Sequence, residues 1–205
     1  MKDFIYLREE NYIEYQRLLR NQDYHDVRLD ELSGGVSAIH TYHKFDKQIG
    51  AFGYRRGDYE RIAVDVLRRK GFRITLESER SEEKLKKCDG LLNDITIDIK
   101  AIEGDGAWSI CTKLNEAAKQ RARIVVIVFP SEAHFSQGRV IDGIQKYCSF
   151  CKYDDHVNMV IVIVKDEIVA YWIKEATPSA EWLSIVKVLG DRTEDRQLSP
   201  LRLQI

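Results

Sequence analysis

The chain has 205 residues, of which 44% are hydrophobic and 32% charged, and its formal net charge is −1. These values are typical of a soluble globular domain, and the longest apolar runs are far shorter than the roughly 20 residues of a transmembrane helix, so neither a membrane span nor a membrane partner is expected. The charge excludes a uniformly basic surface for nucleic acid, and the early acids Asp3, Glu9 and Glu10 do not fit a secretory signal, so a cytoplasmic protein is expected.

The pattern along the chain divides it into three parts: an N-terminal appendage over residues 1–50, an α/β domain over 51–190, and a charged tail over 191–205. The first part is expected to hold a short helix near residues 9–21, a loop at Ser33-Gly34-Gly35, and an extended connection from residue 38 to residue 56.

The core of the domain is expected to begin with a helix, because Asp58 is a plausible N-cap, apolar residues then recur at helical spacing, and Gly71 is a natural stop. A strand over residues 72–76 follows, then a charged loop and a second strand ending near Leu92. Residues 95–101 alternate between isoleucine and polar side chains, which predicts a third strand after a tight turn at Asn93-Asp94.

The second half of the domain continues the same alternation of helices and strands. It predicts a helix over residues 109–121, and a strand over 124–129 that is apolar on both faces and therefore covered on both sides. A helix near residues 140–147, a hairpin of strands 159–164 and 168–173, and a final helix between Pro178 and Gly190 follow. The predicted fold class is α/β, with a mixed central sheet whose helix, three strands, helix, strand core is extended by a C-terminal hairpin and helix.

The third strand carries the residues that point to chemistry. A period of two places Asp98 and Lys100 on one face of a strand that is otherwise isoleucine, which is an unusual position for charges. Asp89, on the antiparallel neighbour, is expected to lie beside Asp98, and Glu60, in the first turn of the preceding helix, could approach from the side. Converging carboxylates can hold Mg²⁺, which prefers oxygen ligands, and a nearby lysine can orient an attacking water. An ordinary exposed ion pair is the competing interpretation for Asp98 and Lys100.

This arrangement resembles the PD-(D/E)xK, or restriction-endonuclease-like, nuclease superfamily over residues 58–129, on the residues Glu60, Asp89 and Asp98-Ile99-Lys100. Cys88 stands where the family signature has proline. The resemblance implies an endonuclease that hydrolyses DNA, or less often RNA, with Mg²⁺ or Mn²⁺ held by Glu60, Asp89 and Asp98. It also implies that Lys113 and Gln120, on the polar stripe of the following helix, contribute to the catalytic site, although an ordinary solvated helix face is the alternative.

Basic residues are concentrated between residues 44 and 73, which indicates a local positive face for a nucleic-acid partner. The candidate nucleic-acid contacts in and beside this stretch are His43, Lys44, Arg55, Arg56 and Arg61. A solvated helix face is an equally good interpretation for any one of them.

Two other functions compete with the metal nuclease. The chain is also similar to nuclease domains of contact-dependent toxins and phage head proteins, through His43-Lys44-Phe45, Glu60, Asp89 and Asp98-Ile99-Lys100. Some of those domains belong to a metal-independent group that cleaves transfer RNA, which would make His43, Lys113 and Arg55 or Arg56 central. A non-catalytic nucleic-acid-binding module is the third candidate. Substrate specificity, the biological setting (mobile element, phage, toxin or defence) and the oligomeric state, monomer or homodimer, are left open.

Overall fold

The computed structural model describes residues 2–78, 88–104, 106–152, 156–174, 182, 185–186, 188–189 and 199–201, with only the backbone described for residues 2–7. Within these ranges, no helix is both long and apolar enough to cross a membrane.

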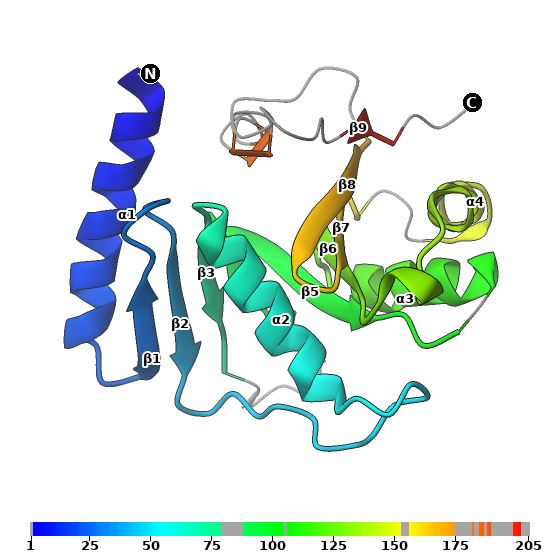
Figure 1. The fold of residues 1–205 in the computed structure, drawn as a ribbon, viewed down its shortest axis with the longest axis horizontal. Coiled ribbons are helices and arrows are strands. Elements are labelled where there is room, and N and C mark those ends of the chain that lie inside the picture. Colours follow the sequence, from blue (N-terminus) through cyan, green and yellow to red (C-terminus); the bar gives the residue numbers. More distant parts are fainter. Residues whose placement is uncertain are drawn as a thin grey trace.

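A single nine-stranded mixed sheet organises the fold, and its strands are ordered in space as they are along the chain (Figure 1). Its elements are α1 (Lys2–Arg20), β1 (Tyr24–Leu29), β2 (Val36–His40), α2 (Arg56–Arg69), β3 (Arg73–Leu76), β4 (Gly90–Leu92), β5 (Ile95–Ala101), α3 (Ala107–Lys119), β6 (Ile124–Phe129), the 3₁₀ turn η1 (Glu132–His134), α4 (Gln137–Phe150), β7 (Met159–Val164), β8 (Glu167–Ile173) and β9 (Ser199–Pro200).

The sheet contains both parallel and antiparallel pairs. The pairs β2/β3, β5/β6, β6/β7 and β8/β9 are parallel, and the other four are antiparallel. Each parallel pair is joined by a longer connection; α2, α3 and α4 supply three of these connections. The tight antiparallel turn between β4 and β5 depends on Asn93 and Asp94, whose φ values of 46° and 68° suit the two-residue hairpin predicted there.

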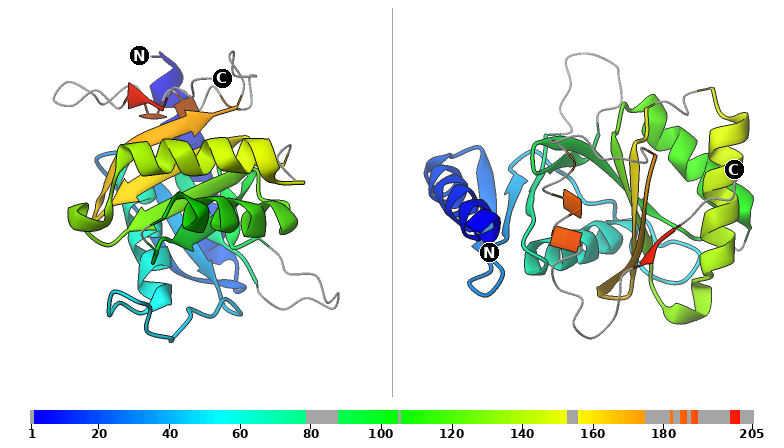
Figure 2. Two further views of the ribbon diagram at one scale, coloured as in Figure 1. Left: turned by 90° about the vertical axis from the view of Figure 1, so that its right-hand side faces the viewer. Right: turned by 90° about the horizontal axis from the view of Figure 1, so that it is seen from above.

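Helices cover both faces of the sheet, as the view from above shows (Figure 2). On one face, α2 packs with the described helical residues of 182–189 against side chains such as Ile97, Ile99 and Val126. On the other face, α3 and α4 pack against the intervening side chains, including Val125 and Ile127. Strands β6 and β7 are buried along their whole length because both of their faces are covered.

The N-terminal 50 residues are part of the same sheet. Leu18 of α1 packs against Val36 and Ala38 on one face of β2, while Ile39 joins the α2 core on the other face. Strand β2 pairs in parallel with β3. The sequence predicted neither β1 nor β2, and the extended connection predicted for residues 38–56 begins inside β2.

The expected α/β mixed-sheet fold is confirmed, including the core order α2, β3, β4, β5, α3, β6 and the extension by the β7/β8 hairpin. Several boundaries were wrong, among them those of α3, which spans Ala107–Lys119 rather than residues 109–121. Helix α2 begins at Arg56 with Arg55 as its N-cap, so Asp58 lies in the first turn, where an acid still favours the positive end of the helix dipole. Glu167 belongs to β8 rather than to the turn. Part of the predicted second strand, residues 85–87, and the ends of the final helix at Pro178 and Gly190 lie outside the described residues.

The close contact between α3 and α4 leads to a prediction about stability. A Cβ atom on Gly143 would lie 2.6 Å from the Cβ of buried Ile110, whereas Gly138, on the same helix α4, has nothing within 4 Å of such an atom. Overpacking costs about 1–3 kcal/mol, and helix propensity offsets up to about 1 kcal/mol of it. Gly143→Ala should therefore lower the free energy of unfolding in urea, and Gly138→Ala should leave it equal or higher. Equal effects of the two substitutions would contradict the close packing.

Candidate active site

The candidate site lies where the sheet opens between β4 and β5. Strand β4 pairs with β5 only from Ile95 to Ile97, while the pairing of β5 with β6 on its other edge continues to Ala101. Beyond Ile97, no strand among the described residues pairs with this edge of β5. Asp89 closes part of this gap, because its Oδ2 accepts a hydrogen bond of 2.6 Å from the backbone N–H of Ile99. The N–H of Ile99, which does not pair with β4, thus fixes the position of the Asp89 carboxylate.

Asp98 and Lys100 share the face of β5 opposite to Ile97 and Ile99, as the period of two predicts. Asp98 is fully buried (0% exposed), and its Oδ2 lies 2.7 Å from Nζ of Lys100, whose side chain is 14% exposed. The prediction that these two residues lie together is confirmed. The interpretation of an exposed surface ion pair is wrong, because both partners are buried or nearly so.

Gln120, which caps the C-terminal end of α3, adds a polar contact to this pair. With its amide turned so that the nitrogen faces Asp98, Gln120 donates to both carboxylate oxygens, at 3.0 Å for Oδ1. In the alternative orientation its Oε1 lies 3.4 Å from Nζ of Lys100. The thiol of Cys88 donates to the backbone oxygen of Gln120 at 2.8 Å. Gln120 is therefore bonded to Cys88 through its backbone and to the Asp98 and Lys100 pair through its side chain.

Two carboxyl groups, those of Asp89 and Asp98, share the single ammonium group of Lys100. Burial first, and then the negative charge of Asp89, raise the pKa of Asp98 well above its usual range, although Lys100 opposes the shift. Burial lowers the pKa of Lys100, but the charges of Asp98 and Asp89 outweigh it, so the net shift is upward. One ammonium thus serves two adjacent carboxylates, and an additional cation or proton would relieve their repulsion.

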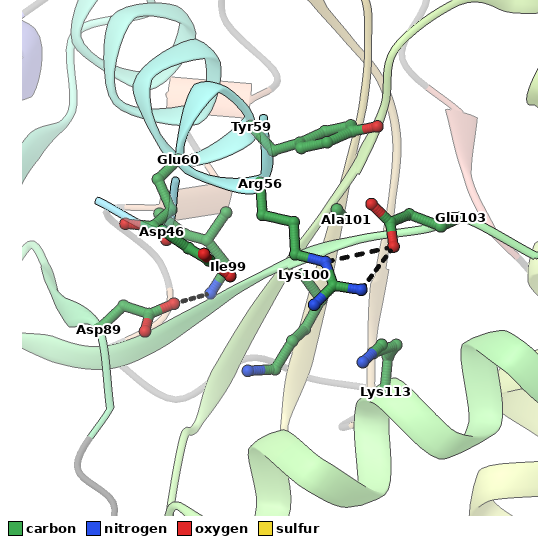
Figure 3. Close-up of a pocket in the computed structure, with 10 residues that line it drawn as sticks. All are labelled: Asp46, Arg56, Tyr59, Glu60, Asp89, Ile99, Lys100, Ala101, Glu103 and Lys113. Carbon is green, nitrogen blue, oxygen red and sulfur yellow. Dashed lines mark hydrogen bonds and ion pairs between the residues drawn. The ribbon is translucent and has the colours of Figure 1, made fainter. Parts of the chain in front are cut away.

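A cavity of about 190 Å³ opens beside this group (Figure 3). It is lined by four acids, three basic side chains and three other residues, namely Asp46, Glu60, Asp89, Glu103, Arg56, Lys100, Lys113, Tyr59, Ile99 and Ala101. The lining comes from α2, β5, α3 and the connection before α2, so elements from both faces of the sheet reach the open edge of β5. Asp98 lies behind this wall and contacts it through Lys100.

Glu60 enters the cavity from α2 and is held from behind by His43. Nε2 of His43 lies 2.9 Å from Oε2 of Glu60, and Nδ1 lies 3.2 Å from the backbone oxygen of Glu77. A carbonyl oxygen can only accept, so Nδ1 must donate to it. A proton must then also lie between Nε2 and Glu60. The His43 side chain is 2% exposed, so this residue orients Glu60 rather than presenting a surface to nucleic acid.

The other predicted residues surround the cavity at different depths. Lys113 lines it and pairs with Glu116 at 2.8 Å. Arg56 lines it and pairs with Glu103 at 3.1 Å. Lys44, Arg55 and Arg61 are exposed nearby, in the connection before α2 and in its first turns, and do not line the cavity.

Sequence reasoning missed Asp46, Tyr59 and Glu103 as lining residues. Oε1 of Glu103 and the hydroxyl of Tyr59 are buried without a hydrogen-bond partner among the described residues. Glu103 could have been found from its place just after β5, since side chains that follow parallel strands meet at one edge of the sheet. Asp46 lies in an irregular connection that carries no periodic signal.

The carboxylates fit a divalent cation in part. Asp89 and Asp98 are adjacent, supply hard oxygen donors, and carry the unbalanced charge that a cation would neutralise. Within the described part of the chain, however, no three His, Cys, Asp or Glu side chains come together closely enough to form a metal site. Glu60 therefore does not complete a closed ligand set with the two aspartates. This arrangement suits Mg²⁺, which commonly keeps several waters and takes only one or two carboxylates from the protein.

The raised pKa of Asp98 predicts a specific pH dependence of stability in metal-free buffer. The unfolded carboxyl titrates near its ordinary pKa of 3.8, so above that value the folded state retains a proton that the unfolded state releases. The contribution of the Asp98 carboxyl to the free energy of unfolding is thus full below the unfolded pKa of 3.8 and is lost as the pH rises through the raised pKa of the folded state. As the pH rises over this window, the unfolding free energy of wild type should fall relative to that of Asp98→Asn. The measurement is urea denaturation with EDTA from about pH 4.5 to 8. Asp94→Asn, whose side chain is 76% exposed on the adjacent turn, is the matched control and should follow wild type.

Comparisons of this chain with protein-family models, curated proteins and solved structures found no match. Its function is therefore inferred from its own residues and their geometry.

Proposed function

We propose that this chain is a nuclease that hydrolyses nucleic-acid phosphodiesters with the help of a divalent metal ion, Mg²⁺ or Mn²⁺. The observation that carries the proposal is the buried Asp98, paired with Lys100 and adjacent to Asp89, at the unpaired edge of β5. A fully buried carboxylate beside a second carboxylate costs stability and gives no packing advantage, which is typical of a functional site.

Each residue has a distinct role in this proposal. Asp89 and Asp98 would hold the cation, and Glu60 would approach it through a bound water. The cation, when bound, supplies a water of lowered pKa and neutralises charge on the phosphate. Lys100, held by Asp98 and facing the cavity, orients the attacking water and stabilises the negative charge that develops on the phosphate. Arg56 and Lys113, on opposite walls, bind the phosphate oxygens of the substrate.

The Glu60 and His43 contact supports a second candidate, a metal-independent ribonuclease. In that reaction Glu60 would accept the proton of a ribose 2′-OH as its oxygen bonds to the adjacent phosphorus, and would return the proton to the 5′-oxygen that leaves, giving a 2′,3′-cyclic phosphate. Arg56 and Lys113 would stabilise the negative charge on the phosphate oxygens. His43 would act through Glu60, because it is buried behind it. This candidate gives no role to Asp98, whose burial it leaves unexplained, so the metal-dependent reaction is preferred.

The first test is cleavage of a mixed panel of DNA and RNA substrates, with DNA expected as the better substrate. With Mg²⁺, wild type and Asp94→Asn should be active, and Asp98→Asn should lose activity by about a hundredfold or more, because it removes a charge that acts on the cation. EDTA should abolish the activity of all three proteins. Asp94 is the matched control because it is an exposed aspartate on the same hairpin. Full activity of Asp98→Asn would overturn the proposal.

Glu60→Gln separates the two reactions. RNA cleavage that survives EDTA and Asp98→Asn but is lost in Glu60→Gln would establish the metal-independent reaction, since the amide cannot accept a proton. In the metal-dependent reaction, Glu60→Gln should reduce the Mg²⁺-dependent rate less than Asp98→Asn does, because Glu60 is outside the adjacent acidic pair. The measurement is the initial cleavage rate of each variant at saturating metal. Binding without cleavage in every protein would support the non-catalytic module instead.

A further inference from the structure

A second cavity lies between α2 and the β1/β2 hairpin, with a volume of about 230 Å³. It is on the face of β2 opposite to α1, because Val36 and Ala38 face α1 while Ser37 and Ile39 line the cavity. The lining combines three arginines, two aspartates, one hydroxyl and three apolar residues, namely Arg28, Arg61, Arg68, Asp26, Asp65, Ser37, Ile39, Phe45 and Val64. None of these residues lines the first cavity.

The charges around this second cavity leave one arginine in excess. Arg28 pairs with Asp26 at 2.7 Å. Arg68 pairs with Asp65 at 2.6 Å and lies 3.5 Å from Asp30. Arg61 has no carboxylate partner among the residues that the structure describes. The acids are thus neutralised by other arginines, and the charge of Arg61 is available to a ligand.

The guanidinium of Arg61 is also held in place. Its Cζ lies 3.8 Å from the centre of the Phe45 ring, a stacking contact that occupies the flat face of the guanidinium. The N–H groups at its edge are not used by this contact, and their fork geometry matches two oxygens of a phosphate. Ser37, which is only 2% exposed, adds a hydroxyl to the same cavity and has no side-chain hydrogen bond within the described residues. These features together suit the binding of an anion.

The two cavities are neighbours across the start of α2. Of the sequence neighbours Glu60 and Arg61, the first lines the first cavity and the second lines the other. The same is true of Asp46 and Phe45, in the connection before α2. A ligand that passes over the first turns of α2 would therefore contact both cavities.

We propose that this second cavity binds a phosphate of the same nucleic-acid strand whose scissile phosphate occupies the first cavity, with Arg61 as its main ligand. The identity of the strand rests on the proposed function, but the anion site rests on the arginine geometry alone. Arg28 and Arg68 line the cavity with their charges matched by Asp26 and Asp65, and Ser37 donates a hydrogen bond. The site acts on binding and register of the substrate and takes no part in bond cleavage.

The test measures binding without cleavage, by fluorescence anisotropy of labelled single-stranded DNA and RNA oligonucleotides in EDTA. Arg61→Gln should raise the Kd several-fold and reduce the slope of log K against log salt by about 0.7, the value for one lost phosphate contact on a single strand. Arg20→Gln changes the same charge at an exposed arginine at the end of α1, outside both cavities, and should match wild type. Arg61→Lys retains the charge and should lie between wild type and Arg61→Gln.

The outcomes separate this inference from the proposed function. Equal binding by Arg61→Gln and Arg20→Gln, with both proteins folded by thermal melting, would overturn the second site. A reduced affinity for inorganic phosphate in Arg61→Gln without a change in strand binding would assign the cavity to a free anion and overturn its role in strand binding. If the binding depends on Arg61 but no protein cleaves with Mg²⁺, the second site stands and the nuclease proposal fails.

Discussion

The departure of β4 from the edge of β5 is the constraint on which the site depends. Three residues of β4 pair with β5, and beyond Ile97 no strand within the described part of the chain pairs with this edge of β5. The backbone N–H of Ile99 is at this edge and needs an acceptor, which is Oδ2 of Asp89. The same gap lets α2 from one face and α3 from the other place side chains around one cavity.

The sheet around this gap is well packed and contains charges that disfavour one another. Strands β6 and β7 are fully buried beside β5, and separate apolar cores cover the two faces. Asp98 and Lys100 lie within this apolar surrounding, where electrostatic interactions are stronger than in water. The free energy of the apolar cores therefore offsets the cost of two adjacent carboxylates, and under the proposed function this arrangement would favour a cation or a developing positive charge.

The sequence predicted the part of the fold in which the chemical pattern is local. Alternation of isoleucine with polar residues defines β5, and six consecutive apolar residues define β6. Strand β1 was missed because its pairing is interrupted between His25 and Arg28, where Asp26 has a φ of 51°, so no alternation is visible. The convergence of Asp89, Asp98 and Lys100 follows from strand period and a two-residue turn. The partner of Glu60 could not be predicted, because His43 lies 17 residues away across an irregular connection.

The start of α2 explains how a chain of net charge −1 could bind a polyanion. Most arginines near this helix are paired with acids, as Arg56 is with Glu103 and Arg68 with Asp65, so they add little net positive charge. Binding then depends on where the excess lies rather than on its total. Arg61 is in excess at one cavity, while Lys100 and Lys113 face the four acids of the other. The first cavity is therefore poorly suited to hold a phosphate until a cation has entered, whereas the second can hold one beforehand. A strand would consequently be positioned by Arg61 first and brought to the acidic cavity only when the metal is present.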